Sequence, residues 1–225
     1  MQTAVAIPNG RIHQTIALRT KWVYDHIARI YPASTFFFHS KAHKIALEMS
    51  GVHNGMKVLE VATGSGELFR RLVRTNPEGH TCGVDLSPNM AARTQAHARR
   101  TFPQASLHCQ AVDARALPYR DSSFDSIFCC YLFELLSTDD IYLTMEEMQR
   151  VLKPRGKLTA ILIGQQAEFF NKAYLVASSL VPAFWGRQMD HSAPGILEAT
   201  GFRVTQERLV RQGFYPSRIL TAIKE

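Results

Sequence analysis

Three carboxylates and two glycines are the residues of this sequence with the clearest chemical potential. Glu60 stands just before a turn that contains Gly64 and Gly66, and Asp85 and Asp113 each follow a later apolar run. Glycines let a ligand approach the backbone closely. A carboxylate beside such a turn would repel a pyrophosphate but could hold a cationic ammonium. The pattern therefore suggests a nucleoside that carries positive charge, and S-adenosylmethionine (SAM) is one.

The common glycine-rich phosphate motifs do not match this turn. The dinucleotide fingerprint would need a third glycine where this chain has Phe69. A phosphate loop would need a Gly-Lys-Ser/Thr ending, which is absent after Gly66. Both classes of phosphate-binding turn are thus disfavoured.

Short apolar strands must position these residues. Val58, Leu59 and Val61 predict a buried strand that runs into the glycine turn, and a helix follows the turn. Further strands are predicted at 81–85, 106–112, 124–130 and 157–163, with helices at 88–100 and 137–152. Ligands of open parallel sheets bind outside the carboxyl ends of the strands, so the three carboxylates should meet in one crevice.

The alternation of strands and helices predicts an α/β fold, a doubly wound Rossmann-like sheet that is mostly parallel. The chain then continues with a helix at 194–200, ended by Gly201, and with two strands at 202–210 and 214–222.

The sequence resembles the class I SAM-dependent methyltransferases. VLEVATGSG is similar to their first motif, VLDVGCGTG, and GVDLSPNM, VDARALPYRDSSFD and EMQRVLKPRGKL resemble its companion motifs in the right order. In pattern it is most similar to the ubiquinone/menaquinone biosynthesis C-methyltransferases, which share a segment like that from Tyr24 to Tyr31. Ala62 replaces the usual first glycine, and we expect the turn to survive because alanine is small. The resemblance also implies that the last two strands form an antiparallel hairpin at the C-terminal edge.

The resemblance implies SAM as the cofactor and suggests a role for each strand tip. Asp85 would accept hydrogen bonds from the ribose hydroxyls, and Asp113 would accept one from the adenine amino group. Each also has a structural alternative, since Asp85 can cap a helix and Asp113 can start a turn. The expected cofactor-binding residues are Glu60, Ala62, Gly64, Gly66, Asp85, Leu86, Met90, Asp113, Ala114, Tyr131 and Tyr31. Leu86 and Met90 would pack on adenine, and the Ala114 N–H would donate to a ring nitrogen.

No side chain stands out as catalytic. Relatives carry His or Asn after the fourth strand, whereas this chain has Tyr131 and Glu134 there. We interpret Glu134 as a carboxylate at a helix start, with a catalytic base as the alternative. The candidates for removing a proton from an acceptor are Tyr24, Tyr31, His39, His43 and His191.

The predicted activity is in-line methyl transfer from SAM to a small apolar or aromatic acceptor, as in C- or O-methylation of a quinol or phenol. Two alternatives stay open. An RNA methyltransferase would use the formal net charge of +7. A SAM-binding protein without transferase activity would share the donor site.

One methyltransferase domain over 1–225 is expected, with a helical cap at 21–51, a SAM-binding core at 56–164, a lid at 165–195 and a C-terminal helix and hairpin at 196–225. In the cap, a helix ends at Pro32, and Phe36, Phe37 and Phe38 precede a second helix that Gly51 ends. The lid is inferred from its excess of aromatic side chains, which could cover an acceptor.

Composition limits the remaining classes. A hydrophobic content of 46% predicts a globular core, and the basic residues are dispersed, which disfavours nucleic acid as a partner. Four cysteines without a C-x-x-C spacing indicate buried thiols in a reducing cytoplasm, with no metal site. No apolar run could span a bilayer, so we expect a cytoplasmic protein that could still contact anionic lipid.

Overall fold

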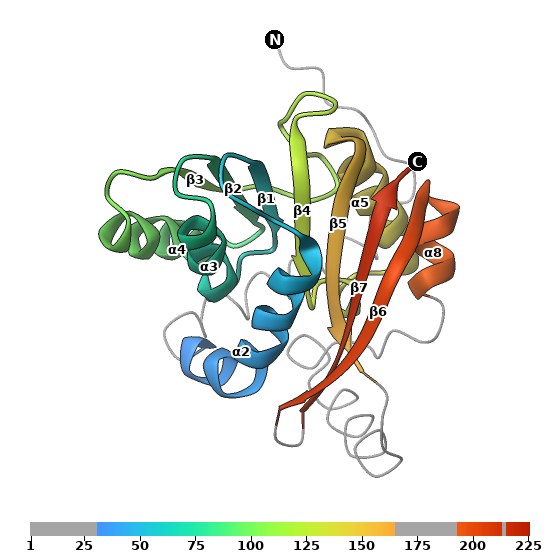
Figure 1. Cartoon of the computed structure of the whole chain (residues 1–225), viewed down its shortest axis with the longest axis horizontal. Coiled ribbons are helices and arrows are strands. Elements are labelled where there is room, and N and C mark those ends of the chain that lie inside the picture. Colours follow the sequence, from blue (N-terminus) through green and yellow to red (C-terminus); the bar gives the residue numbers. More distant parts are fainter. Residues whose placement is uncertain (1–30, 165–192, 213–214) are drawn as a thin grey trace.

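The computed structural model describes residues 31–164, 193–212 and 215–225, which form one sheet flanked by helices (Figure 1). In chain order the elements are α2 (Tyr31–Ser50), β1 (Lys57–Val61), α3 (Glu67–Thr75), β2 (His80–Asp85), α4 (Pro88–Thr101), β3 (Ser106–Ala111), β4 (Phe124–Cys130), the 3-10 helix η1 (Phe133–Leu135), α5 (Thr138–Val151), β5 (Leu152–Ile163), α8 (Ala193–Ala199), β6 (Phe202–Gln212) and β7 (Tyr215–Lys224).

The seven strands lie in the order β3-β2-β1-β4-β5-β7-β6. The first five of these are mutually parallel, whereas β7 is antiparallel to both β5 and β6. The chain builds outward from β1 to β3 and then crosses back to place β4 on the other side of β1. The strand order therefore reverses between β1 and β4, which is where open α/β sheets bind ligands. The predicted Rossmann-like sheet with an antiparallel C-terminal edge hairpin is confirmed.

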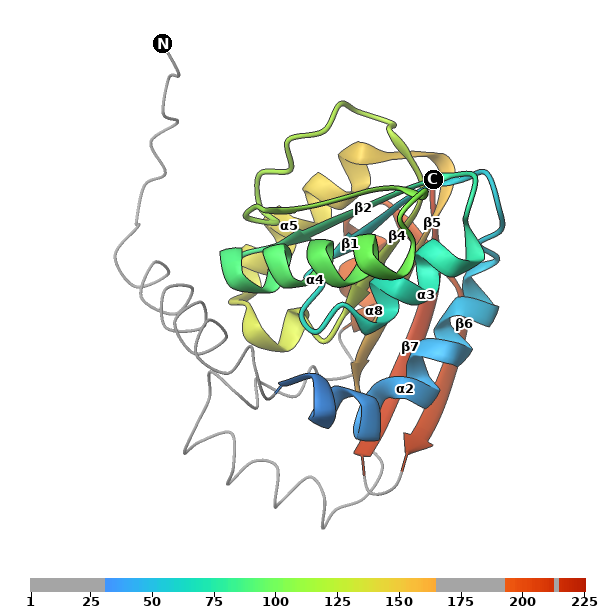
Figure 2. The same ribbon diagram turned by 90° about the vertical axis from the view of Figure 1, so that its left-hand side faces the viewer.

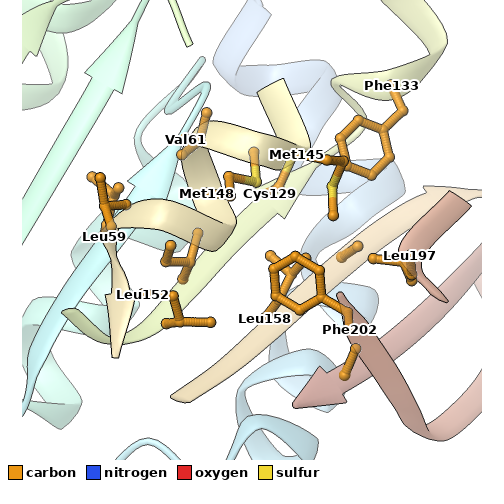
Figure 3. Packing of buried hydrophobic residues seen from close by; sticks show 14 of the residues in the cluster. Leu59, Val61, Cys129, Phe133, Met145, Met148, Leu152, Leu158, Leu197 and Phe202 are labelled. Carbon is orange, nitrogen blue, oxygen red and sulfur yellow. The ribbon is translucent and has the colours of Figure 1, made fainter. Parts of the chain in front are cut away.

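Helices cover both faces of the sheet. On one face α2, α3 and α4 lie side by side, as Figures 1 and 2 both show. On the other face α5 and α8 bury their apolar sides: Met145 and Met148 of α5 and Leu197 of α8 join Phe202 in the main core (Figure 3). Burying a side chain of this size stabilises the fold by roughly 1.5–3 kcal/mol. The core thus holds in place the strands at whose carboxyl ends the ligand crevice is predicted.

The predicted helix boundaries are confirmed at several ends. The Ser87 side chain caps α4 by accepting a hydrogen bond from the Met90 amide at 3.2 Å, and Pro88 is the first helical residue. Ser137 caps α5 in the same way. Gly51 and Gly201, with φ of 70° and 80°, follow the ends of α2 and α8. Glycine adopts this left-handed conformation without steric penalty.

Two predicted boundaries are wrong. The second cap helix, predicted to follow positions 36–38, is α2 and already begins at Tyr31, so Pro32 lies in its first turn, where proline is tolerated, and positions 36–38 lie within it. The strand predicted from Lys157 begins at Leu152, because Leu152 already pairs with Phe124 before an irregularity in the ladder. The first cap helix up to residue 30 and the predicted lid up to residue 192 lie outside the described residues, whereas positions 193–195, predicted as the end of the lid, begin α8.

Within the described ranges, no helix is both long and apolar enough to cross a membrane. All four cysteines are free, and Cys82, Cys109 and Cys129 are buried, as predicted. Burial raises the pKa of the Cys109 thiol to about 12. Such a thiol is not ionised at neutral pH and is unreactive.

Candidate functional site

The turn after β1 contains three residues whose backbone is in the left-handed conformation. Ala62, Gly64 and Gly66 have φ of 64°, 47° and 72°. The Ala62 amide donates to the Val84 carbonyl of β2 at 2.8 Å, which fixes the start of the turn. The turn survives with alanine at position 62, as predicted, although an L side chain in this conformation costs about 1–2 kcal/mol.

Gly66 brings two helices together at the edge of this turn. A Cβ atom at Gly66 would lie 2.6 Å from Thr94 Oγ1 and 3.0 Å from Thr94 Cγ2. Thr94 belongs to α4, and Gly66 immediately precedes α3. Only glycine therefore lets the N-terminus of α3, with its partial positive charge, lie this close to α4.

Asp85 joins the glycine turn to the start of α4. Its Oδ2 accepts a hydrogen bond from the Gly64 amide at 2.8 Å, and its Oδ1 accepts one from the Ser87 amide at 2.9 Å. The carboxylate is half-buried, and each of its oxygens can accept more than one hydrogen bond. Next to it, the Leu86 side chain is 37% exposed. The predicted helix-capping role and the predicted ribose role are thus compatible in one carboxylate.

Glu60 is a buried carboxyl group beneath the turn. Its side chain is 2% exposed, and Oε2 has no hydrogen-bond partner among the described residues. Burial raises the pKa of Glu60 well above its usual value, and the nearby charge of Asp85 raises it further, whereas Arg70 acts in the opposite direction. An unpartnered buried carboxyl oxygen next to a second carboxylate favours a ligand that brings a hydrogen-bond donor and a positive charge. A SAM ammonium group has both properties, so the residues fit this cofactor.

Asp113, after β3, is tied to an arginine that the sequence did not single out. Its two carboxylate oxygens accept hydrogen bonds from Arg115 Nε and Nη2, the shortest at 2.6 Å. Arg115 also donates to Asp140 of α5 at 2.7 Å. Burial acts to raise the pKa of Asp113, but the hydrogen bonds from Arg115 outweigh it and lower the pKa. Asp113 is therefore ionised and held at the crevice, beside the half-buried Ala114.

Tyr131 follows β4 on the other side of the switch point. Its φ is 54°, an unusual conformation for a bulky residue. Its hydroxyl shares a 2.7 Å hydrogen bond with Ser217 Oγ of β7. Its ring lies on the His39 ring of α2, with centroids 4.3 Å apart. Three elements therefore meet at this side chain.

Glu134 lies in the first turn of a helix, as predicted, but that helix is the short η1 and not α5. It is in the middle of the short helix η1, is 2% exposed, and accepts a hydrogen bond from the Ile163 amide of β5 at 2.6 Å. Burial raises the pKa of Glu134 to about 7, although its backbone hydrogen bonds act to lower it. The carboxyl group thus holds η1 against the end of β5, and α5 begins only after Ser137.

The remaining candidates are dispersed. Met90 is 1% exposed and lies in the interior, so it is not at the surface of the crevice in this structure. His43 Nδ1 lies 3.6 Å from Glu67 Oε2, at the start of α3. Tyr31 begins α2, but its side chain, like Tyr24 and His191, is outside the described residues. The structure brings together Glu60, Asp85 and the glycines on one side of the switch point and Tyr131 on the other.

Arg115 and Ser217 are contacts that the sequence did not reveal. The spacing of Asp113 and Arg115 could have indicated the role of Arg115, since a guanidinium two residues along the chain can hydrogen-bond the carboxylate. Nothing local marks Ser217.

Comparison with known proteins gives consistent matches. Residues 58–156 match a protein family described as a methyltransferase domain. The chain is 30% identical over 163 residues to a 2-phytyl-1,4-naphtoquinone methyltransferase of Nostoc punctiforme, with 68% of this chain and 70% of the relative covered. It is 29% identical over 185 residues to a ubiquinone/menaquinone biosynthesis C-methyltransferase of Cellvibrio japonicus, with 79% and 73% covered.

Among solved structures, a SAM-dependent methyltransferase from Aquifex aeolicus superposes with a TM-score of 0.65 at 22% identity, with 93% of this chain and 98% of that chain covered. At this identity the likeness concerns the fold.

Proposed function

Because the chain belongs to the class I SAM-dependent methyltransferases, near the ubiquinone/menaquinone C-methyltransferase family, we propose that it methylates a small aromatic acceptor of the hydroquinone or phenol type. It is a methyltransferase whose cofactor is SAM. When bound, this cofactor supplies an electrophilic methyl group on a positively charged sulfur. The names of the two sequence relatives, which refer to quinone substrates or quinone biosynthesis, support the acceptor class.

One observation carries the proposed donor site: the buried Glu60 Oε2 without a partner among the described residues, next to the left-handed glycine turn. We assign Glu60 to the ammonium group of the cofactor and Asp85 to its ribose hydroxyls. Asp113 and Leu86 would then hold the adenine, the first by its carboxylate and the second by its exposed apolar surface. Each assignment pairs a donor or apolar group of the cofactor with the complementary group of the chain.

The chain contributes mainly by positioning. The Gly64 and Ser87 amides already hold Asp85 in place, so the carboxylate does not have to be ordered when a ligand arrives. Arg115 holds Asp113 in the same way. A fixed donor site lets the reacting groups meet in a defined geometry, which is a large part of what catalysis of methyl transfer requires.

The donor site is tested by paired isosteric variants. We expect Glu60→Gln and Asp85→Asn to weaken S-adenosylhomocysteine binding, measured by calorimetry, by roughly tenfold or more, since each loses a charged hydrogen-bond acceptor. The matched control is Asp125→Asn at the start of β4, where Asp125 accepts from the Lys57 amide at the opposite end of the strands. Equal binding by all three variants would overturn the assignment.

The acceptor class is tested by turnover. Transfer of a labelled methyl group to hydroquinones or phenols, against amines and short RNA as competing acceptors, is the expected result. Transfer confined to amines or RNA, or none to any acceptor while S-adenosylhomocysteine binds, would refute the proposed acceptor class.

A further inference from the structure

Three polar or aromatic side chains from distant parts of the chain meet beside the donor site. Tyr131 follows β4, Ser217 lies on β7 and His39 lies on α2. The Tyr131 hydroxyl and Ser217 Oγ are 2.7 Å apart, and the rings of Tyr131 and His39 are 4.3 Å apart at an angle of 31°. We call these three residues the tyrosine cluster.

The tyrosine cluster lies on the acceptor side of the strand-order reversal. Val61 pairs with Cys129, so the glycine turn after β1 and Tyr131 after β4 leave neighbouring strands at almost the same level. Ligands of open α/β sheets bind between the loops that leave such a pair of strands. A donor held by the glycine turn would therefore have the tyrosine cluster as its neighbour.

The backbone at Tyr131 is strained in a way that directs the side chain. Its φ of 54° is left-handed, and its amide is fixed by a 2.7 Å hydrogen bond to the Ile161 carbonyl of β5. Bulky residues rarely adopt this conformation, and such strain concentrates at ligand sites. In this conformation Tyr131 reaches Ser217 on β7 and packs against the apolar cluster formed by α2, β5, β6 and β7.

We propose that the Tyr131 hydroxyl, oriented by Ser217 and supported by the His39 ring, binds the hydroxyl group of an aromatic acceptor. This inference rests on the proposed function and specifies its acceptor site. A phenol hydroxyl has one donor and two acceptor sites, so it can take part in more than one hydrogen bond at a time. Burial, followed by the charge of His43, lowers the pKa of His39 to about 3, although Glu67 acts to raise it. The imidazole is therefore uncharged and stacks as a neutral ring.

The experiment compares two probes that share the naphthalene ring and differ in whether its oxygen carries a proton, which it can donate, or a methyl group. Binding of 1-naphthol and of 1-methoxynaphthalene is measured by calorimetry with saturating S-adenosylhomocysteine. The wild-type protein should prefer 1-naphthol, and Tyr131→Phe, which keeps the ring, should reduce that preference by roughly 2- to 12-fold, the range of one neutral hydrogen bond. Ser217→Ala keeps the phenol and should reduce the preference less.

The matched control is Tyr119→Phe, which removes another phenol, one that accepts a hydrogen bond from Gln110 at 3.3 Å. It should retain the wild-type preference. Circular dichroism verifies the fold of each variant, and Ser217→Ala carries the test if Tyr131→Phe does not fold. An unchanged preference in the folded variants would overturn the tyrosine cluster as acceptor site.

The two proposals fail in different ways. If hydroquinones are methylated but Tyr131→Phe discriminates between the probes like the wild type, the acceptor site is wrong and the proposed function stands. If Tyr131→Phe loses the preference but no phenol or hydroquinone is methylated, the hydroxyl-binding site stands and the proposed function is wrong.

Discussion

Gly66→Ala should destabilise the protein and weaken its donor site together. The new methyl group would lie 2.6 Å from Thr94 Oγ1 and 3.0 Å from Thr94 Cγ2, closer than real side chains approach. The φ of 72° adds backbone strain for any L side chain. The Thr94 side chain, the turn or α4 must therefore shift.

The magnitude follows from two separate terms. Left-handed strain amounts to about 1–2 kcal/mol, and overpacking of this kind to about 1–3 kcal/mol. A smaller opposite effect, about 0.4–1 kcal/mol, comes from the reduced freedom of alanine in the unfolded chain. We expect the free energy of unfolding to fall by about 2–4 kcal/mol, or the Tm by roughly 4–16 °C for a chain of this size.

The assay is urea and thermal unfolding followed by circular dichroism, with S-adenosylhomocysteine affinity measured on the same samples. The control is Gly55→Ala, because Gly55 has a φ of 90° but a Cβ atom there would meet no other atom within 4 Å. It isolates the backbone strain from the contact with Thr94, so it should lose only about 1 kcal/mol. Its cofactor affinity should not change.

A double mutant identifies the contact itself. Thr94→Ala removes both of the closest atoms, so Gly66→Ala combined with Thr94→Ala should lose less stability than the sum of the single variants. If the losses are additive, or if Gly66→Ala and Gly55→Ala are equally destabilised, the close approach of α3 to α4 does not explain the glycine.

Three other predictions concern single residues. Ala62→Gly should raise the free energy of unfolding by about 0.5–1 kcal/mol, seen as a higher urea midpoint, because glycine relieves the backbone strain of an alanine at a φ of 64°. A loss of stability would show that Ala62 is not strained. Burial raises the pKa of Glu134 to about 7 from a usual 4.5, so the folded state keeps a proton that the unfolded state loses. The free energy of unfolding should therefore fall by about 3 kcal/mol as the pH rises from 4.5 through 7. Glu134→Gln should make the free energy of unfolding, measured in urea titrations from pH 4.5 to 8, less dependent on pH. An unchanged dependence would show that Glu134 is not its cause. Arg115→Met should lower the free energy of unfolding by about 1.5–3 kcal/mol, because the buried Asp140 loses its cationic partner. The control Arg120→Met, at an exposed position, should change the free energy of unfolding little.

The donor half of the fold was predictable because its signals are local. A buried strand, a turn of small residues and a helix follow one another within residues 57–75, and the same pattern of apolar strand and terminal carboxylate recurs at Asp85. Caps such as Ser87 and Ser137 depend only on the next few residues, so they too could be identified.

The part of the fold from β4 to β7 depends on contacts that no local pattern encodes. Ser217 lies 86 residues from Tyr131 and reaches it only because β7 inserts antiparallel next to β5. Glu134 is a helix-start carboxylate, but its partner is the amide of Ile163 in β5, a residue 29 positions away. Burial changes the chemistry of such a group, and burial is a property of the assembled fold.

The reversal of strand order between β1 and β4 separates the residues assigned to the cofactor from those assigned to the acceptor along the sheet. On the proposed assignments, changes confined to β7 and the segment after β4 would alter which compound is recognised while the β1–β3 portion keeps its hydrogen bonds. For protein engineering, this makes the chain a scaffold in which new substrate preferences can be selected by randomising one flank alone.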